Sequence, residues 1–205
     1  MASWPGPIRA RSYPLGVGGE RLHEWMRELA VWRRHAGLEG GVENASTEVL
    51  EQGNDDVGAI IMGRNMFGGG PGPWGDDPWR GWWGDDPPFH VPVFVLTHHP
   101  RPPLECFGGT TFTFVTDGPA AALALARAAA GGRGMAVSGG AGVAGQDVAA
   151  GLVDEIAIHL AATFLGDGVR IFESPALAAV ALEQVRAVEA PGVTHLTYRL
   201  GNAVR

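Results

Sequence analysis

The strongest constraint on the fold is the segment 135–146, which reads MAVSGGAGVAGQ. Small and apolar residues at 135–137 lead into glycines, and the apolar periodic run 143–153 follows directly. This order predicts a buried strand, a tight glycine turn and the start of a helix. Such a turn lets an anion reach the backbone, where the first helical N–H groups point at it. The segment is therefore either a phosphate or dinucleotide site or a glycine turn that only lets helix and strand pack.

The rest of the chain alternates predicted strands and helices. The continuous apolar run at 57–62 predicts a strand that is buried on both faces, and 91–96 is expected to form the next strand. Further strands are expected at 110–115, 155–164, 180–189 and 193–200, and helices at 20–34, 46–50 and 120–130, the second of them capped by Ser46 or Thr47. The pattern predicts an α/β fold with a mostly parallel sheet and a C-terminal antiparallel pair of strands.

Composition narrows the class of protein. A net charge of −7 argues against general affinity for nucleic acid or anionic membranes. The apolar runs are shorter than the ~20 residues that a membrane span requires, and the N-terminus shows no signal peptide. Cys106 is the single cysteine among 205 residues, which fits a reducing compartment. We therefore expect a cytoplasmic protein with one domain over 20–205, preceded by an irregular segment over 1–19.

The stretch 68–90 is too rich in proline and glycine for regular structure, and it contains WGDDP twice, beginning at Trp74 and Trp83. A loop of this length is usually a lid, a binding loop or an oligomer contact. The repeated aspartates invite a calcium site, but the alternation of an EF-hand loop is absent, so no metal is expected. The tryptophans, which include Trp79 and Trp82, are expected to pack the loop down or to cap a pocket for a flat ring.

Three predicted strands end in groups that could hold a ligand, and ligands bind at the carboxyl ends of parallel strands. Arg64 offers a cation, Thr97 with His98 and His99 offers a hydroxyl and two imidazoles, and 139–142 offers backbone N–H groups. Together they suit an adenosine dinucleotide with a 2′-phosphate. Each also has a simpler reading, in which Arg64 caps a surface turn and the histidines are solvated.

Five segments carry a resemblance to a known family: GAIIMGR (58–64), PVFVLTH (92–98), GGA (139–141), AGLVDE (150–155) and LGDGVRIF (165–172). In this order they resemble the dihydrofolate-reductase-like family, and within it the riboflavin-biosynthesis reductase domain, the C-terminal domain of the bifunctional deaminase-reductase. The resemblance covers roughly 14–200. It implies a three-layer fold with helices on both faces of the sheet, and the late position of the glycine turn argues against a Rossmann-type fold.

The resemblance also implies a function. It implies an NADPH-dependent oxidoreductase, active as a homodimer, that transfers hydride to a pyrimidine- or pteridine-like heterocycle. The first choice of substrate is 5-amino-6-(5-phosphoribosylamino)uracil, and dihydrofolate is the second. The implied cofactor contacts are Gly63, Arg64 and Met66 for the 2′-phosphate and pyrophosphate, Thr97 and His98 for the adenosine, and Gly139, Gly140, Ala141, Gly142 and Val143 for the diphosphate.

Two departures from the family pattern leave another possibility open. The first strand of the family, which ends in an SLDG-like turn, is missing or replaced before Gly6-Pro7. No catalytic acid is identifiable: Glu24 is the nearest candidate, yet with Glu20 and Glu28 it equally forms a solvated helix face. A non-enzymatic nucleotide-binding or assembly protein that retains the fold is therefore the alternative from a different class.

Overall fold

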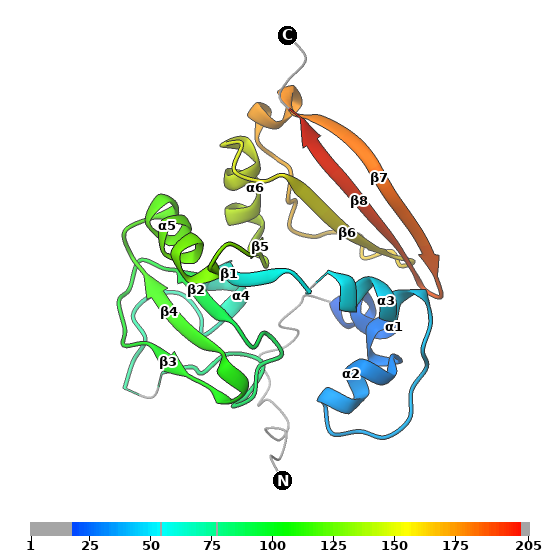
Figure 1. Ribbon diagram of the computed structural model, residues 1–205, viewed down its shortest axis with the longest axis horizontal. Helices are drawn as coiled ribbons and strands as arrows, with labels where there is room; N and C mark the ends of the chain where they lie inside the picture. The colour runs from blue at the N-terminus through cyan, green and yellow to red at the C-terminus, as the bar shows by residue number, and fades with distance from the viewer. Residues whose placement is uncertain (1–17, 54, 77, 202–205) are drawn as a thin grey trace. The chain divides into compact units, whose positions relative to one another are not determined.

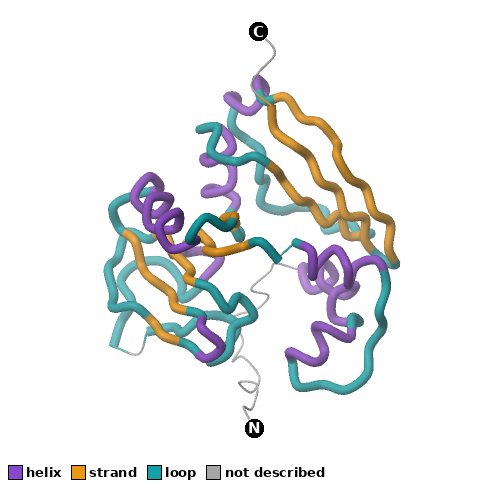
Figure 2. The backbone as a smooth tube through the Cα atoms, in the orientation of Figure 1, coloured by secondary structure: helices purple, strands orange, loops and turns teal. Residues whose placement is uncertain are grey.

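The computed structural model describes residues 18–53, 55–76 and 78–201. The chain divides into two compact units (Figures 1 and 2). Unit 2 is the continuous stretch Asp55–Val148, and unit 1 combines the residues before it with those from Ala149 onward. That 20–205 act as a single domain remains a prediction. Each unit has its own sheet and is described on its own.

Unit 2 contains a five-stranded sheet in the order β3-β4-β2-β1-β5. The strands are β1 (Val57–Gly63), β2 (Pro92–Leu96), β3 (Leu104–Glu105), β4 (Thr111–Val115) and β5 (Gly134–Val137). Neighbouring strands from β4 to β5 run parallel, and only β3 pairs antiparallel. The sequence predicted this parallel arrangement, because strands of a parallel sheet are covered on both faces and therefore appear as continuous apolar runs.

One face of this sheet packs on α5 (Pro119–Ala130), an alanine-rich helix with Pro119 in its first turn. Its buried residues Ala122, Ala126 and Ala130 recur at four-residue spacing, so one helical stripe meets the sheet. The approach is close: a Cβ on Gly58 of β1 would lie 2.6 Å from the carbonyl oxygen of Ala130. Small side chains on both elements therefore set the spacing of these two layers.

The other face is covered by aromatic side chains from the tryptophan-rich loop 68–90. Phe67, which ends the short helix α4 (Arg64–Phe67), is fully buried there with Phe112 of β4. Trp74, Trp79 and Trp83 pack against the same cluster. The expectation that the tryptophans pack the loop down is confirmed for these three, whereas Trp82 is 38% exposed. The loop supplies the third layer of unit 2. The short 3₁₀ helix η2 (Phe107–Gly109) lies between β3 and β4.

After β5 comes α6 (Ala141–Ala149). The sequence predicted a helix over 143–153, so the observed helix begins earlier and ends earlier. Gly151 follows it with a φ of 68°, a left-handed conformation that ends helices.

Unit 1 contains a three-stranded antiparallel sheet in the order β6-β8-β7. The strands are β6 (Glu155–Ala161), β7 (Ala181–Ala190) and β8 (Val193–Gly201), and the 3₁₀ helix η3 (Pro175–Ala179) precedes β7. The C-terminal pair of strands is as predicted. The prediction placed β6 among the parallel strands and extended it to Phe164; instead it pairs antiparallel with β8 and ends at Ala161.

The N-terminal part of unit 1 is helical: η1 (Gly19–His23), α1 (Glu24–Arg27), α2 (Ala30–His35) and α3 (Ala45–Gln52). The single helix predicted from Glu20 is wrong, because Leu29 adopts an extended conformation, is fully buried and bridges to Val42. The cap of α3 is Asn44 rather than Ser46 or Thr47, and its Oδ1 accepts from the Ser46 amide at 2.8 Å. The segment before Gly6-Pro7, where the first family strand was expected to be missing or replaced, lies outside the described residues.

Candidate functional site

Three parallel strand ends meet at one edge of the unit 2 sheet, because β2, β1 and β5 are adjacent and run in the same direction. Gly63 and Arg64 stand at the end of β1, Thr97 follows β2, and the glycine turn follows β5. This edge is where α/β sheets bind ligands. The structure therefore brings together the three groups that the sequence singled out.

The glycine turn packs directly on the end of β1. Gly139 and Gly140 have φ of 79° and 84°, and the Gly63 amide donates to the Gly139 carbonyl at 3.2 Å. A Cβ on Gly139 would lie 2.9 Å from the Met66 sulfur. Glycine is thus required here by conformation and by space. The predicted site residues Gly63, Met66, Gly139 and Gly140 form one cluster, which we call the glycine cradle.

The cradle leads into the first turn of α6. The Ala144 amide donates to the Gly140 carbonyl at 3.0 Å, which starts the helical ladder. The amides of the predicted residues Ala141, Gly142 and Val143 precede that bond, where α-helices lack intrahelical acceptors. A Cβ on Gly142 would meet nothing within 4 Å, and a Cβ on Gly63 would lie 3.1 Å from Val143. An anion at this turn would meet backbone rather than side chains, so the residues fit a diphosphate.

Arg64 is held in place by its own loop. Its Nε donates to the Gly68 carbonyl at 3.1 Å and its Nη2 to the Gly70 carbonyl at 2.9 Å. Its guanidinium lies 3.1 Å from the centroid of the Trp74 ring, a cation–π contact. Burial, and then the charge of Arg101, lower the pKa of Arg64. Its Nη1, which carries two N–H donors, is buried and has no partner among the described residues.

The two residues predicted to flank adenosine differ in their surroundings. Thr97 is buried, its amide donates to the Val115 carbonyl at 3.0 Å, and its Oγ1 accepts from the His99 amide at 3.2 Å. His98 is exposed. Thr97 therefore shapes the turn after β2, and His98 presents its ring to solvent beside it.

Glu24, the weak candidate for a catalytic acid, lies in α1 of unit 1 and is exposed, as are Glu20 and Glu28. Glu20 forms an ion pair with Arg27. The arrangement matches the solvated-face reading. In the described ranges, no group of three or more His, Cys, Asp and Glu side chains could hold a metal ion. Over the same ranges, no helix is both long and apolar enough to cross a membrane.

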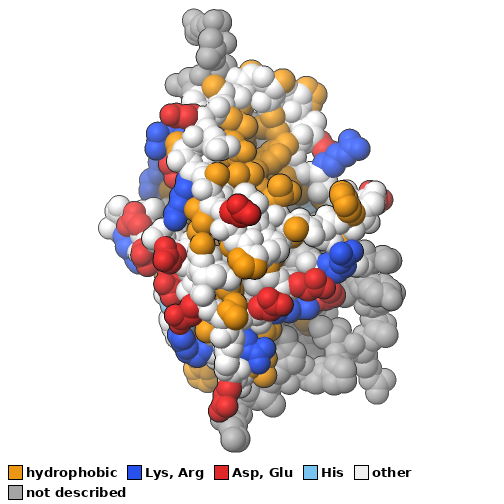
Figure 3. All heavy atoms as spheres, turned by 90° about the vertical axis from the view of Figure 1, so that its right-hand side faces the viewer, with side chains coloured by type: hydrophobic (Ala, Val, Ile, Leu, Met, Phe, Trp, Pro, Cys, Tyr) orange, Lys and Arg blue, Asp and Glu red, His pale blue; other side chains and the backbone are white. Residues whose placement is uncertain are grey.

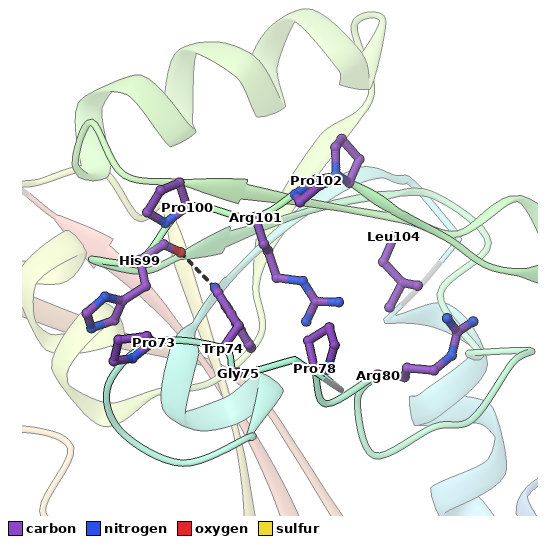
Figure 4. Close-up of a pocket in the computed structure, with 11 residues that line it drawn as sticks. Pro73, Trp74, Gly75, Pro78, Arg80, His99, Pro100, Arg101, Pro102 and Leu104 are labelled. Carbon is purple, nitrogen blue, oxygen red and sulfur yellow. Dashed lines mark hydrogen bonds between the residues drawn. The ribbon is translucent and has the colours of Figure 1, made fainter.

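Sequence reasoning allowed that the tryptophans of the loop 68–90 cap a pocket, but it missed the arginines of the pocket of about 590 Å³ that lies beside this edge (Figure 4). Its polar lining is Arg80, His99 and Arg101, with Trp74 between them in the wall. The Trp74 indole N–H donates to the His99 carbonyl at 2.8 Å, which fastens the loop to the end of β2. The unusual PRPP run at 100–103 is the signal that could have pointed to it, because it fixes an arginine between rigid prolines.

Fold and cradle together define an α/β protein with glycines at the carboxyl end of adjacent parallel strands, the edge where such sheets bind ligands. The family can also be stated. The chain belongs to the RibD C-terminal domain family, whose model matches residues 34–196. The predicted dihydrofolate-reductase-like α/β class, with its riboflavin-biosynthesis branch, is thereby confirmed. No curated protein matches the chain.

Solved structures agree on the fold. A protein of Shewanella sp. PV-4 assigned to riboflavin biosynthesis has a TM-score of 0.52 at 20% identity, over 78% of this chain and 81% of that one. Acinetobacter baumannii RibD has a TM-score of 0.52 at 14% identity, over 80% of this chain and 52% of that one. A deaminase/reductase of Thermotoga maritima has 0.50 at 11% identity, over 82% and 52%. The chain thus spans about half the length of the two latter proteins.

Proposed function

We propose that this protein is an NADPH-dependent reductase of a small pyrimidine- or pteridine-like heterocycle. The observation that carries the proposal is the glycine cradle: two glycines with positive φ, packed on Gly63 and Met66 at the shared edge of parallel strands. Bound NADPH supplies the hydride. The residues of the chain bind and orient it, with the diphosphate at 139–143, the 2′-phosphate at Arg64 and the adenosine beside Thr97 and His98. Positioning of donor and acceptor is the main requirement of such a transfer.

The first experiment is a titration of the protein with NADPH and with NADH, followed by the thermal midpoint and by energy transfer from tryptophan to the nicotinamide. A ligand that binds the folded state raises the midpoint with its concentration. We expect saturable stabilisation by NADPH and a weaker effect of NADH. A cooperative melt that neither cofactor shifts would show that the cradle serves only packing.

For the substrate we propose 5-amino-6-(5-phosphoribosylamino)uracil or a close analogue. The support is the family, together with the Thermotoga maritima protein, which is named a 5-amino-6-(5-phosphoribosylamino)uracil reductase. Oxidation of NADPH on addition of the aminouracil, but not of dihydrofolate, is the expected result. Oxidation with dihydrofolate alone would favour the dihydrofolate-reductase reading. NADPH binding without oxidation by either would favour a nucleotide-binding protein without catalysis.

We also propose that the protein is a cytoplasmic homodimer. Support for the dimer comes from the unit 1 sheet, where alternate residues of β6 and β8 share one face. That mostly apolar face, which we call the apolar face, contains Ile156, Ile158, Leu160, Leu182, Leu196, Tyr198 and Leu200, with the polar Gln184, Glu189 and Thr194 toward it as well. Leu160 and Leu182 are 60% and 58% exposed. Hydrophobic side chains gather on the side of the molecule where β7 and β8 lie (Figure 3), as at surfaces that pair with a second copy.

A further inference from the structure

One exposed turn of unit 1 brings a side-chain carboxyl group against the next backbone amide. The loop 162–174 joins β6 to η3 (Figure 1), and it contains the dipeptide Asp167-Gly168. The Gly168 amide donates to Oδ1 of Asp167 at 2.7 Å. Because Oδ1 is bonded directly to Cγ, this contact also holds the amide nitrogen beside the carboxyl carbon.

The surroundings of this turn leave room for the backbone to rotate. A Cβ on Gly168 would meet no atom within 4 Å, and Gly166, on the other side of Asp167, has a φ of 80° that favours glycine. Phe164 and Val169, which flank the turn, are 97% and 85% exposed. No packed side chain therefore opposes a change of backbone conformation at Asp167.

The adjacent amide defines a reaction of the carboxyl group. The Gly168 nitrogen bonds to Cγ of Asp167, the C–O bond to the carboxyl hydroxyl breaks, and the amide proton leaves with that hydroxyl as water. The product is a cyclic imide. Water then opens the ring: attack at the side-chain carbon restores aspartate, and attack at the main-chain carbon leaves the chain linked through Cγ, as isoaspartate. Water is the sole co-reactant, and holding the two reacting atoms together accelerates the first step.

A second Asp-Gly pair in the chain provides an internal comparison. Asp117 is also exposed, but in the described part of the chain no hydrogen bond joins its carboxylate to the Gly118 amide. Gly118 is instead the N-cap of α5, where its carbonyl accepts from the Ala122 amide at 3.2 Å. Pro119 follows it, and proline restricts the backbone of the residue before it. The same dipeptide is therefore arranged for reaction in unit 1 and for helix capping in unit 2.

We propose that Asp167 is a site of spontaneous isoaspartyl modification, which the fold favours over the other Asp-Gly pair. The modification adds one methylene group to the backbone of the loop that leads to η3 and β7, directly before the exposed Val169. The negative charge stays, but it moves to a free α-carboxylate. That carboxylate is the group on which isoaspartyl methyltransferases act, so the site defines a class of partner enzyme. The proposal does not require the reductase activity.

The test incubates the full folded chain at physiological temperature and pH. Trypsin then releases the peptide 134–170, which lies between Arg133 and Arg170 and contains Asp167, and electron-transfer fragmentation distinguishes isoaspartate from aspartate. We expect isoaspartate to accumulate at Asp167 about tenfold faster than at Asp117, because intramolecular rates depend steeply on the placement of the reacting atoms. In denaturant, where both dipeptides lose their folded geometry, the two rates should approach each other.

Gly168→Val tests the contact within the folded chain. Its Cβ has open space, so the variant should fold like the parent, while the branched side chain crowds the amide nitrogen and should slow the reaction about tenfold. The matched control is Val169→Ala, which changes an exposed neighbour and leaves the dipeptide intact, so the rate should stay that of the parent. Absence of isoaspartate at Asp167, equal rates at Asp167 and Asp117 in the folded chain, or an unchanged rate in Gly168→Val would overturn the proposal.

Discussion

The Ser46 hydroxyl lies 2.8 Å from Nε2 of His195, across 149 positions of sequence, and joins α3 to the central strand of the unit 1 sheet. Nδ1 of His195 lies 2.7 Å from Nδ1 of His159. The edge of the Trp25 ring system meets His195, with centroids 5.2 Å apart. When both imidazoles are neutral, one Nδ1 donates and the other accepts. Two protonated rings would turn two N–H donors toward each other.

Unit 1 should lose stability as the pH falls. Burial lowers the pKa of both His159 and His195 below the ordinary value of 6.5, and for His195 the charges of His159 and Arg186 add to the effect. The unfolded chain therefore binds protons first, so the stability is full above pH 6.5 and is lost as the pH drops toward the lowered values. Urea unfolding at pH 8 and pH 5 measures the difference, and the free energy of unfolding should be lower at pH 5.

His159→Gln should reduce the change in the free energy of unfolding between pH 8 and pH 5. His98→Gln, at an exposed position, should leave that change as it is in the parent. A free energy of unfolding that is constant from pH 8 to pH 5 would contradict the prediction.

Gly139→Ala should disrupt the cradle. A Cβ there would lie 2.9 Å from the Met66 sulfur, and the φ of 79° strains any L side chain. We expect a loss of about 1–2 kcal/mol in unfolding free energy and a larger loss of cofactor affinity. Gly142→Ala is the matched control, since its Cβ would meet nothing within 4 Å. Similar behaviour of the two variants in chemical unfolding and NADPH titration would argue against a tight cradle.

Arg64→Ala should discriminate between the cofactors. The buried Nη1 without a partner is the donor that a 2′-phosphate would meet. The substitution also frees the carbonyls of Gly68 and Gly70, which loosens the loop for either cofactor. The ratio of the two dissociation constants removes that shared effect. We expect the NADPH constant to rise about tenfold more than the NADH constant, and an equal rise for both would refute the phosphate contact.

Asp147→Asn should stabilise unit 2. The Asp147 side chain is buried in α6, where desolvation raises the pKa of its carboxyl group. At neutral pH the carboxylate form therefore costs stability, and that cost disappears as the pH falls through the raised pKa. The neutral amide should increase the unfolding free energy at pH 7 by about 1 kcal/mol, or the melting temperature by about 2–4 °C. Asp117→Asn, at an exposed site, is the control; a lower melting temperature for Asp147→Asn alone would show that the carboxylate has a structural role.

Leu182→Glu should weaken the proposed dimer without unfolding the monomer. Leu182 is 58% exposed on the apolar face of unit 1, so the charge costs little until a second copy covers it. Analytical ultracentrifugation should show a dimer for the parent chain and monomers for the variant. A dimer of unchanged strength would place the interface elsewhere.

The elements that sequence predicted well are those whose pattern is local. The β1 and β2 strands are continuous apolar runs, and α5 is marked by Pro119 and a repeated alanine stripe. The break of the N-terminal helix at Leu29 was not predictable from periodicity, since it depends on a bridge to Val42 and on burial. The partner of β6 was missed for a similar reason, because the strand that it joins lies more than thirty positions away.

The candidate site shows the same contrast between features that a local sequence pattern reveals and features that depend on distant contacts. The glycine cradle could be predicted from the sequence, because backbone positions with positive φ favour glycine and a run of glycines is directly recognisable. Arg101 was not singled out, since its surroundings are assembled by Trp74 from a loop with no regular period. Arg64 was predicted either to meet a phosphate or to cap a surface turn, and three-dimensional packing gives most of its donors to backbone carbonyls of the loop that follows it.

The division of the chain has a consequence for its synthesis. Unit 2 is one uninterrupted stretch, and its last residue, Val148, is synthesised before any strand of the unit 1 sheet. The parallel sheet and the glycine cradle of the nascent chain can therefore form before His195, the hydrogen-bond partner of Ser46 in α3, has been synthesised. The unit 1 helices, which precede unit 2 in the chain, therefore find their partners after the unit 2 sheet can form, so unit 1 is the part of the nascent protein that stays accessible to chaperones and proteases for longer.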